Sequence, residues 1–576
     1  MKRCLLLVAG ISLVCGGARA LGQASPLDFQ RVAPKLPPRS DRAVTLPSAE
    51  DPDIGDDTPV LAELKGIVML SDASQVRAGG RPGITRVVSE GTGLMTSPAL
   101  AVRLSAFLGK GATFGELQRA CAEIVRFYRE HNRPVVDAQL PEQDVTSGVV
   151  QIVVVEGRVG RIIAEDQRWF SEQRLIAGMR SQRGESIDSR KLLDDINWLN
   201  RNSFRHSDLV FREGQSAGET DLVLKTTDRF PFRPYLAYDN WGTDLTGNHR
   251  LQTGFNWGNA FGLDQIVSYQ FSMAPDPAVF NAHAAVWTIP LPWRHLLEFY
   301  GSTARSQPEG LDVDVDAKSL QLGVLYTVPL PTFAGIKHDI ALGAELKQSN
   351  NNLLFGGTSI FDSDTEIAQA RLTYQMRRVD AHGATVLQAS AFYSPGGITA
   401  NNTDAAFQEE RAFAEANYYY GRLMVQRTQK LPWKVTMVGT IAGQLASGNL
   451  LASEQFSVGG ATTVRGYDEG FLNGDRGWLG SVELHSPPTT VLSRVRSGTF
   501  EEELKLLAFF DLGGVSNIDL LPDERRYTEV AAAGVGLRYR LNTWMSVRFD
   551  YGWPIRQISG IERQNDRAFL SVTVSY

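Results

Sequence analysis

The sequence predicts a transmembrane β-barrel of about 16 antiparallel strands, preceded by two small α+β modules. Three observations lead to this fold class. The chain begins with an export signal, helical periodicity is confined to the part before Asp228, and strand-like segments of alternating polarity continue from there to Tyr576. No stretch after the signal approaches the roughly 20 apolar residues that a spanning helix needs, which favours crossing by strands.

Residues 1–20 have the features of a secretory signal peptide. Lys2 and Arg3 precede an apolar run that ends at Val14, and Ala18 and Ala20 occupy the small-residue positions of a signal-peptidase site. The apolar run is too short for a membrane anchor. Two of the three cysteines leave with this segment, so we expect no intramolecular disulfide in the mature chain.

Composition excludes several classes of function. The formal charge of the 576 residues is −6 and no basic tract is present, which argues against a nucleic-acid partner. No nucleophile, base and orienting residue stand at readable spacing, and the eight histidines form no metal-ligand cluster. The sequence therefore predicts no enzyme, no cofactor and no metal.

Residues 21–60 are predicted to form an extended Pro-rich linker, with "PKLPPRSDR" at its centre. A short helix fits over "SPLDFQRV", Ser25 to Val32. Four prolines oppose any longer helix: Pro34, Pro37, Pro38 and Pro47.

The first module is predicted over residues 61–158, with strands over "LAELKGIVML" and "GVVQIVVVEG". Between them, "FGELQRACAEIVRFYREH" has the spacing of an amphipathic helix. Its apolar face is predicted to consist of Phe114, Leu117, Cys121, Ile124, Val125 and Tyr128. Cys121 is expected to be a buried core thiol, not a reactive one.

The second module is predicted over residues 159–228 and repeats the plan. A strand over "VGRIIAE" precedes a short helix over "SEQRLIAGM" and a second helix over "DSRKLLDDINWLNRN", capped by Asp188. Two strands follow, "SDLVFRE" and "ETDLVLKTT". Each module is thus expected to run strand, helix, helix, strand, strand, with an antiparallel sheet and the helices on one side.

The barrel is predicted over residues 229–576. In "MSVRFDYGW" five apolar side chains alternate with polar ones and glycine. A soluble sandwich also alternates, but these segments have the length of a tilted membrane strand and continue for too long for one sandwich. Arg538, Arg540 and Arg548 lie on the polar face, as in a wet lumen. Because main-chain groups in lipid must pair internally, the sheet must close.

Connections of two lengths alternate along this region. Short turns are predicted at "PLPW" (Pro290 to Trp293), "PLPT" (Pro329 to Thr332) and "LN" (Leu541 and Asn542). Longer polar connections, such as the one from Ser394 to Glu410, separate them. Short turns on one side and long loops on the other are typical of outer-membrane barrels.

Two motifs carry the candidate site. "GGATTVRGYDEG" contains Val464, Arg465, Gly466 and Tyr467 in a Gly-rich loop. "FFDLGGV" contains a Phe-x-Asp-x-Gly pattern in a strand, with members Phe509, Asp511 and Gly513.

These motifs resemble the signature loop and the accompanying strand of the Omp85 superfamily. "LPEQDVTSGVVQIVVVEGRVGRI" is similar to the end of the first POTRA domain of two-partner secretion transporters (TpsB proteins of the ShlB, FhaC and HecB type). "DSRKLLDDINWLNRN" with "GETDLVLKTTDR" resembles their second POTRA domain. The resemblance covers roughly Leu61 to Tyr576, and the combination is far more specific than the bare VRGY tetrapeptide.

The resemblance implies a sixteen-stranded outer-membrane barrel whose loop, about residues 455–475, folds into the lumen. It implies a salt bridge between Arg465 and Asp511, since a guanidinium offers a carboxylate a rigid fork. A direct pair predicts that exchanging the two charges restores some function. Gly466 would allow a tight turn, and Tyr467 would pack against the wall and donate its hydroxyl proton. The alternatives are a solvated loop arginine and a solvated lumen carboxylate.

The resemblance also implies the function: a pore that secretes or activates an unfolded, haemolysin-like or adhesin-like partner exoprotein (a TpsA-like client) from the periplasm. The chain is expected in the outer membrane of a Gram-negative bacterium, with the POTRA domains in the periplasm. Sheet edges in these domains could bind an extended client through main-chain hydrogen bonds; a spacer role is the alternative. Further expected partners are outer-membrane lipid and the barrel-assembly machinery. The terminal Tyr576 resembles the signal that this machinery recognises, and the alternative is an ordinary strand end.

Three rival functions stay open at this stage. A barrel-assembly or insertion factor of the same superfamily would normally carry several modules instead of two. A diffusion porin would not need VRGY paired with the strand motif. An outer-membrane enzyme lacks a catalytic constellation.

The chain departs from the family pattern in three places. The first module carries a Gly-rich insertion from Ser71 to Gly93. "HNRPVV" (His131 to Val136) stands where the family usually has a Gly-aromatic turn. The prolines of the linker argue against the N-terminal helix that plugs the pore in many members. We therefore expect the first module to bind differently, and the sequence leaves open whether an N-terminal helix plugs the pore.

Overall fold

The structure is a computed structural model that describes residues 32–37, 58–243, 246–307, 314–333, 335–355, 358–491, 501–522, 524–558 and 564–576. The predicted signal peptide, most of the linker and the short helix before Val32 lie outside these ranges. The chain divides into two units. One holds both small modules, and the other holds the barrel together with residues 32–37.

The first module is built on a four-stranded sheet of order β3-β2-β6-β5. Strands β2 and β6 pair in parallel, so the predicted antiparallel sheet is wrong at this pair. Two helices cross between these strands, and such a crossover returns the chain in its original direction. The elements are β1 (Pro59–Leu61), β2 (Gly66–Leu70), β3 (Val87–Glu90), α2 (Pro98–Ser105), β4 (Ala112–Thr113), α3 (Phe114–Glu130), β5 (Val136–Gln139) and β6 (Val149–Glu156), with 3₁₀ turns at Ala73–Gln75 and Gly93–Thr96.

Helix α3 begins at a capping box. The Thr113 side chain accepts from the Glu116 amide, and the Glu116 carboxylate accepts from the Thr113 amide. Its buried face differs from the prediction: Ala120 and Phe127 are fully buried, while Val125 is half-buried and Phe114 is 37% exposed at the first turn. Cys121 is buried as predicted, and burial raises the pKa of its thiol to about 12.

The Gly-rich insertion builds an additional layer on the first module. It supplies β3, which pairs in parallel with β2. Its residues Val76 and Ile84 pack on the sheet face opposite the helices, against Val68 and its neighbours. The buried Arg81 donates to Gln151 Oε1 at 3.0 Å and to the Gln75 carbonyl at 2.9 Å. Both faces of this sheet are therefore covered.

The second module has the predicted order of elements and a sheet of order β7-β9-β8. Here too one pair, β7 with the central strand β9, is parallel, because two helices cross between the first strand and the later ones. Asp188 caps α5 by accepting from the Arg190 and Lys191 amides. The elements are β7 (Arg158–Glu165), α4 (Glu172–Ala177), α5 (Ser189–Leu199), β8 (Arg205–Glu213) and β9 (Glu219–Asp228).

One buried carboxylate, Asp221, fastens β9 to β7. It accepts from the Arg161 amide at 2.7 Å and from the guanidinium Nε and Nη2 atoms at 3.0 and 2.7 Å. The hydrogen bonds from Arg161 hold the pKa of Asp221 below its ordinary value. The carboxylate thus stays charged at neutral pH.

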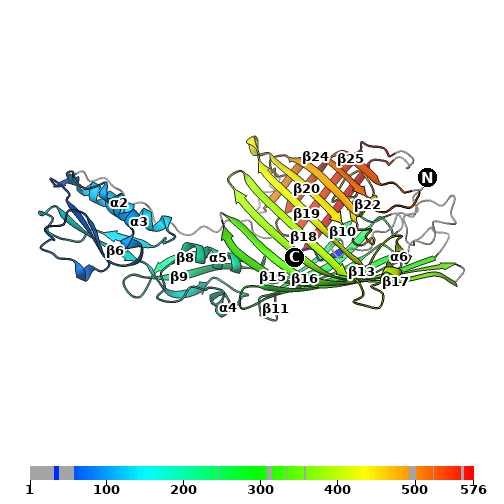
Figure 1. The fold of residues 1–576 in the computed structure, drawn as a ribbon, viewed down its shortest axis with the longest axis horizontal. Coiled ribbons are helices and arrows are strands. Elements are labelled where there is room, and N and C mark those ends of the chain that lie inside the picture. Colours follow the sequence, from blue (N-terminus) through cyan, green and yellow to red (C-terminus); the bar gives the residue numbers. More distant parts are fainter. Residues whose placement is uncertain are drawn as a thin grey trace. The chain divides into compact units, whose positions relative to one another are not determined.

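The barrel is a closed sheet of sixteen strands, as predicted. Each strand pairs antiparallel with the next, and β10 closes the sheet against β27 (Figure 1). The strands are β10 (Phe232–Asp239), β11 (Arg250–Ala260), β12 (Gln265–Met273), β13 (Phe280–Pro290), β14 (Leu296–Ser306), β15 (Asp314–Phe333), β16 (Ile336–Phe355), β17 (Thr358–Asp380), β18 (Gly383–Pro395), β19 (Asn417–Lys430), β20 (Thr436–Ala446), β23 (Arg476–His485), β24 (Glu502–Ser516), β25 (Tyr527–Leu541), β26 (Met545–Pro554) and β27 (Arg567–Ser575).

Alternating burial distinguishes the two faces of the barrel wall. On β10, Arg233, Tyr235 and Asp239 are buried on the inner face, while Leu236 is 65% exposed on the outer one. An apolar exterior and a polar interior are what a membrane barrel requires. No helix among the described ranges is long and apolar enough to cross a membrane.

One of the predicted turns is wrong. Pro329 to Thr332 belong to β15 and form no turn. The pairing of β14 with β15 ends at Thr327, so the missing N–H of Pro329 costs no hydrogen bond on that side. The connection after β18 is not entirely irregular, because it contains α6 (Asp404–Glu410), capped by the Thr403 hydroxyl.

Candidate functional site

The loop between β20 and β23, residues 447–475, carries the VRGY motif. It contains a short hairpin of β21 (Phe456–Val458) and β22 (Leu472–Gly474). We call residues 459–471 the loop tip and residues 447–455 the loop start. Gly459 and Gly460 follow β21 with φ angles of 111° and 108°, in a region that side chains rarely adopt. Glycine is therefore required where the tip leaves the hairpin.

The tip approaches the wall more closely than side chains would permit. Gly466 has a φ of 107°, and a Cβ there would lie 3.1 Å from the backbone of Gly552 on β26. A Cβ on Gly552 would in turn lie 2.7 Å from the Arg465 backbone. Gly513 of the strand motif leaves space for the buried Val464 in the same way. Glycines on both partners thus allow this contact.

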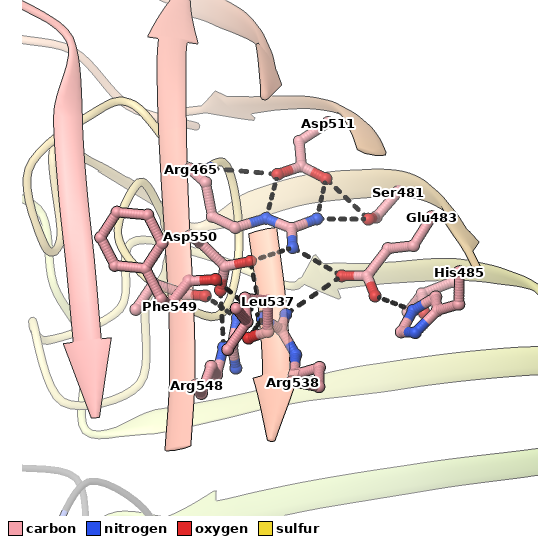
Figure 2. A network of polar contacts seen from close by, with 12 residues as sticks. Arg465, Ser481, Glu483, His485, Asp511, Leu537, Arg538, Arg548, Phe549 and Asp550 are labelled. Atoms are coloured by element: carbon pink, nitrogen blue, oxygen red, sulfur yellow. Dashed lines mark hydrogen bonds and ion pairs between the residues drawn. The ribbon is translucent and has the colours of Figure 1, made fainter. Parts of the chain in front are cut away.

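Arg465 and Asp511 lie together, as the resemblance implied. Arg465 is 2% exposed and Asp511 is fully buried. Guanidinium Nε donates to Asp511 Oδ2 at 2.8 Å and Nη2 donates to Oδ1 at 2.9 Å, while the Arg465 amide also reaches Oδ2 at 3.2 Å (Figure 2). This bidentate fork is a geometry that lysine could not reproduce.

Two further carboxylates, which sequence reasoning missed, complete an acid cluster around Arg465. Glu483 Oε1 on β23 lies 2.6 Å from Nη1, and Asp550 Oδ1 on β26 lies 3.4 Å from it (Figure 2). With Asp511 on β24, the cluster comes from three strands. The alternation of "MSVRFDYGW" places Asp550 on the polar, inward face of the strand. Alternation alone does not predict which residue a lumen carboxylate contacts.

Two further arginines balance the acid cluster, and a histidine contacts it. Arg538 Nη1 lies 2.9 Å from Asp550 Oδ1, and Arg548 Nε lies 2.7 Å from Asp550 Oδ2. His485 Nε2 lies 2.7 Å from Glu483 Oε2 (Figure 2). Phe509 covers the site, with its ring centroid 3.5 Å from Arg465 Cζ, a cation–π arrangement.

Tyr467 fixes the other side of the tip. Its side chain is buried, and its hydroxyl lies 2.7 Å from the Arg556 carbonyl and 3.1 Å from the Ala531 carbonyl, to which it donates. The ring packs beside Phe471. All predicted members of the two motifs are therefore in or next to this contact between tip and wall.

The loop start has an anchor of its own, Glu454, which the sequence did not reveal. This residue is fully buried. Its Oε1 accepts from Lys347 Nζ at 2.7 Å, and its Oε2 accepts from the Tyr420 hydroxyl at 2.5 Å and from Gln369 Nε2 at 3.1 Å. These partners lie on β16, β19 and β17. The loop is thus fixed to two different parts of the wall.

A second segment also lies inside the barrel: residues 32–37, which we call the N-terminal strip. Val32 is 3% exposed and belongs to an apolar cluster with Phe280 and Ala282 of β13 and Ala304 of β14. Lys35 Nζ lies 4.0 Å from Asp239 Oδ2. Residues 33–37, which carry Pro34 and Pro37, form no helix, and only Val32 is helical. This part of the predicted linker lies against the barrel wall.

The terminal Tyr576 ends the closing strand. Its side chain is 80% exposed, and its amide donates to the Pro234 carbonyl of β10 at 3.2 Å. Within the described ranges, no group of three or more His, Cys, Asp or Glu residues is placed to hold a metal ion.

Comparison with known proteins identifies the family. The sequence model of the haemolysin secretion/activation protein family ShlB/FhaC/HecB matches residues 218–539, and that of the ShlB-type POTRA domain matches residues 83–157. The chain belongs to the ShlB/FhaC/HecB family. This confirms the predicted relationship.

Individual relatives are distant in sequence but match over two thirds or more of their length. The chain is 23% identical to the outer membrane transporter CdiB of Dickeya dadantii over 78% of each chain. It is 24% identical to the heme/hemopexin transporter protein HuxB of Haemophilus influenzae over 67% of this chain and 68% of HuxB.

Solved structures support the fold. CdiB from Escherichia coli matches with a TM-score of 0.69 at 17% identity over 95% of both chains. BamA from Haemophilus ducreyi, lacking POTRA domains 1–3, matches with a TM-score of 0.51 at 14% identity over 83% of this chain and 97% of that one.

Membership in the ShlB/FhaC/HecB family places this protein in the outer membrane with its POTRA domains in the periplasm. It is a transporter of the two-partner secretion type. Of the alternatives left open by the sequence, family membership favours secretion over barrel assembly and passive diffusion.

Proposed function

We propose that this transporter receives a TpsA-like exoprotein unfolded in the periplasm, passes it through the barrel and releases it to fold outside. In this proposal the loop tip is a fixed part of the lumen. The observation that carries it is the buried contact of Arg465 with Asp511, Glu483 and Asp550. A charge that is surrounded in this way holds its loop in one position, because leaving it unpaired is costly.

The POTRA domains would supply the first binding site. In the second domain β8 is an edge strand, since no strand of the described chain lies beyond it. The Asn200 side chain caps one end of that edge, accepting from the Ser207 amide at 2.7 Å and donating to the Ser207 carbonyl at 2.9 Å. An extended client could continue the pairing from there, through main-chain groups and without regard to its sequence.

The remaining partners follow from the surface of the barrel. Exposed apolar side chains on the outer face, such as Leu236 and Leu342, would contact outer-membrane lipid. Tyr576 at the end of β27 would be read by the barrel-assembly machinery during insertion. The proposed function has no catalytic step, in keeping with a family of transporters.

Planar-bilayer conductance tests this function. The purified full-length protein is reconstituted and exposed to a periplasmic extract from its own source, and the blocking protein is identified by mass spectrometry. We expect large, fluctuating steps that one exported protein blocks. A protease-treated extract is the control. Steady steps that no extract component changes would contradict secretion and favour a diffusion pore.

A further inference from the structure

The barrel wall beneath the N-terminal strip carries side chains that bind the main chain of a polypeptide. Among the described residues, the contacts are Gln270 Nε2 donating to the Val32 carbonyl at 3.1 Å, the Lys35 amide donating to the Tyr235 hydroxyl at 3.0 Å, and Arg233 Nη1 donating to the Lys35 carbonyl at 3.1 Å. Each of these involves a main-chain atom of the strip. The same three hydrogen bonds would form if the strip carried other side chains at positions 32 and 35.

The three wall residues are held in place by one another and by their strands. The Tyr235 hydroxyl donates to Gln270 Oε1 at 2.9 Å, and Arg233 Nη1 also donates to Asn256 Oδ1 at 2.9 Å. All are less than 10% exposed. Gly254 on β11 leaves the space for the tyrosine, since a Cβ there would lie 2.5 Å from its hydroxyl. The site is therefore built in advance and does not depend on the strip for its shape.

Residues 33–37 of the strip form neither helix nor strand. Proline at positions 34 and 37 restricts the residues before it, Ala33 and Leu36, to extended conformations. The wall thus binds an extended segment with one small apolar side chain in the Val32 pocket and a basic side chain three residues later near Asp239. Gln252 Oε1, buried beside Asp239, has no hydrogen-bond partner in the described part of the chain. It is an acceptor that a longer or differently placed peptide could use.

We propose that this part of the wall, which we call the seat (Arg233, Tyr235, Gln270 and the Val32 pocket), binds an extended segment of the client during export, and that the N-terminal strip is its resting occupant. The inference rests on the proposed secretion function and adds a site to it. Because the seat binds main-chain atoms, it can accept clients of many sequences. The strip, attached to the same chain, has a high effective concentration and rebinds when the client has passed.

Removing one hydroxyl tests the seat. Tyr235→Phe loses the acceptor for the Lys35 amide and the donor to Gln270 while keeping the ring. Tyr238→Phe is the matched control, since its hydroxyl lies on the outward side of the same strand and bonds to His249. Two quantities are measured: conductance of the purified protein, and the export rate of whichever protein stops being released when the chain is deleted.

The proposal predicts that Tyr235→Phe increases the open-channel fraction and also slows export, each by roughly three- to tenfold, because one hydroxyl is worth about a single hydrogen bond. The control should change neither. Increased opening with normal or faster export would show that the seat holds the strip alone, and this would overturn the proposal. Unchanged opening would overturn it as well. If deletion stops no protein from being released, the secretion function fails instead.

Synthetic peptides test the main-chain reading directly, again on the full-length protein in bilayers. A copy of Val32 to Pro37 should compete with the strip and prolong channel opening. A second copy with alanine in place of its lysine should act within about threefold of it, because the long Lys35 contact contributes little. A third copy, N-methylated at the lysine position, should be at least roughly tenfold weaker, because it has lost the donor to Tyr235. Equal activity of the N-methylated peptide would contradict the seat.

Discussion

The loop tip and the N-terminal strip both lie against the inner wall of the barrel, but they are held in opposite ways. The tip is held through a side chain, Arg465, whose charge is surrounded by carboxylates from three strands. The strip is held mainly through main-chain atoms, by Gln270, Tyr235 and Arg233. The first arrangement accepts one occupant, while the second accepts almost any extended chain.

This difference indicates which segment stays and which leaves. Pulling Arg465 away would leave the buried Asp511 without the guanidinium that pairs with it, and such separation costs several kcal/mol. Releasing the strip exchanges two neutral hydrogen bonds, each worth about 1 kcal/mol, and one from the Arg233 guanidinium, worth about 1.5–3 kcal/mol, for bonds of the same kinds. A lumen with a fixed loop and an exchangeable strip can transport a chain without losing its own architecture.

The largest effect is expected for Arg465→Ala. The variant leaves Asp511 buried without its fork, at a cost of about 3–5 kcal/mol, which corresponds to a fall in export of at least about 100-fold. The measurement is the amount of client in the medium. A heat-modifiability gel checks that the barrel is folded in the membrane. Arg465→Lys keeps the charge and loses the fork, so its export should lie between that of the wild type and that of Arg465→Ala. Normal export by Arg465→Ala would remove the role given to the tip.

An exchange of charges, Arg465→Asp with Asp511→Arg, should not restore export. A simple pair would tolerate the exchange, as the motifs alone implied. In the structure, however, a carboxylate at position 465 would face Glu483 and Asp550, and like charges repel. Export by this double variant should stay as low as that of either single variant. Recovery to more than about a tenth of the wild-type rate would mean that these two acids do not act on the tip.

A smaller effect is expected for Glu454→Gln at the loop start. The amide keeps the hydrogen bond from Tyr420 but removes the charge that faces Lys347, whose ammonium also lies 3.7 Å from Glu345. The loss of about 1–2 kcal/mol should raise the open-channel fraction about tenfold while the tip stays in place. Glu409→Gln, on the exposed face of α6, is the control. No change in conductance would show that the tip holds the loop without help.

The smallest effect is expected for Lys35→Ala. Only the 4.0 Å contact with Asp239 is removed, and this buried carboxylate keeps its hydrogen bonds from Gln252 Nε2 at 2.8 Å and from the Trp241 amide at 3.2 Å, so we expect a cost of about 1 kcal/mol. Conductance should change less than about fivefold. A change as large as that of Arg465→Ala would mean that the strip is recognised by its side chain, and the contrast between the two segments would disappear.

The sequence predicted those parts of the molecule in which the signal is local. Alternation along the strands predicted the sixteen-stranded barrel, and the two motifs identified Arg465 and Asp511 as partners. Glu454 could not be found in this way. It lies in "LLASEQF", which has no periodicity, and its partners Lys347 and Gln369 are distant in sequence and meet it only in the closed barrel.

The prolines of the strip also show that local sequence does not predict contacts with distant residues. They predict an extended chain correctly, but backbone conformation does not determine whether that chain lies in solvent or against a wall. Parallel pairing of β2 with β6 was missed for a related reason, since strand direction depends on the whole crossover and not on either strand alone.

The most direct test of the account is export by barrels in which one segment or the other is fixed by a disulfide. Phe456→Cys with Gly477→Cys would fix the hairpin that carries the tip, because a Cβ at position 477 contacts the Phe456 ring. Val32→Cys with Ala282→Cys would fix the strip within its apolar pocket. The buried Cys121, with its pKa raised to about 12, should not interfere. We predict that oxidation leaves export by the first barrel near its reduced rate and stops export by the second. Loss of export on oxidation of the first barrel would contradict a fixed loop.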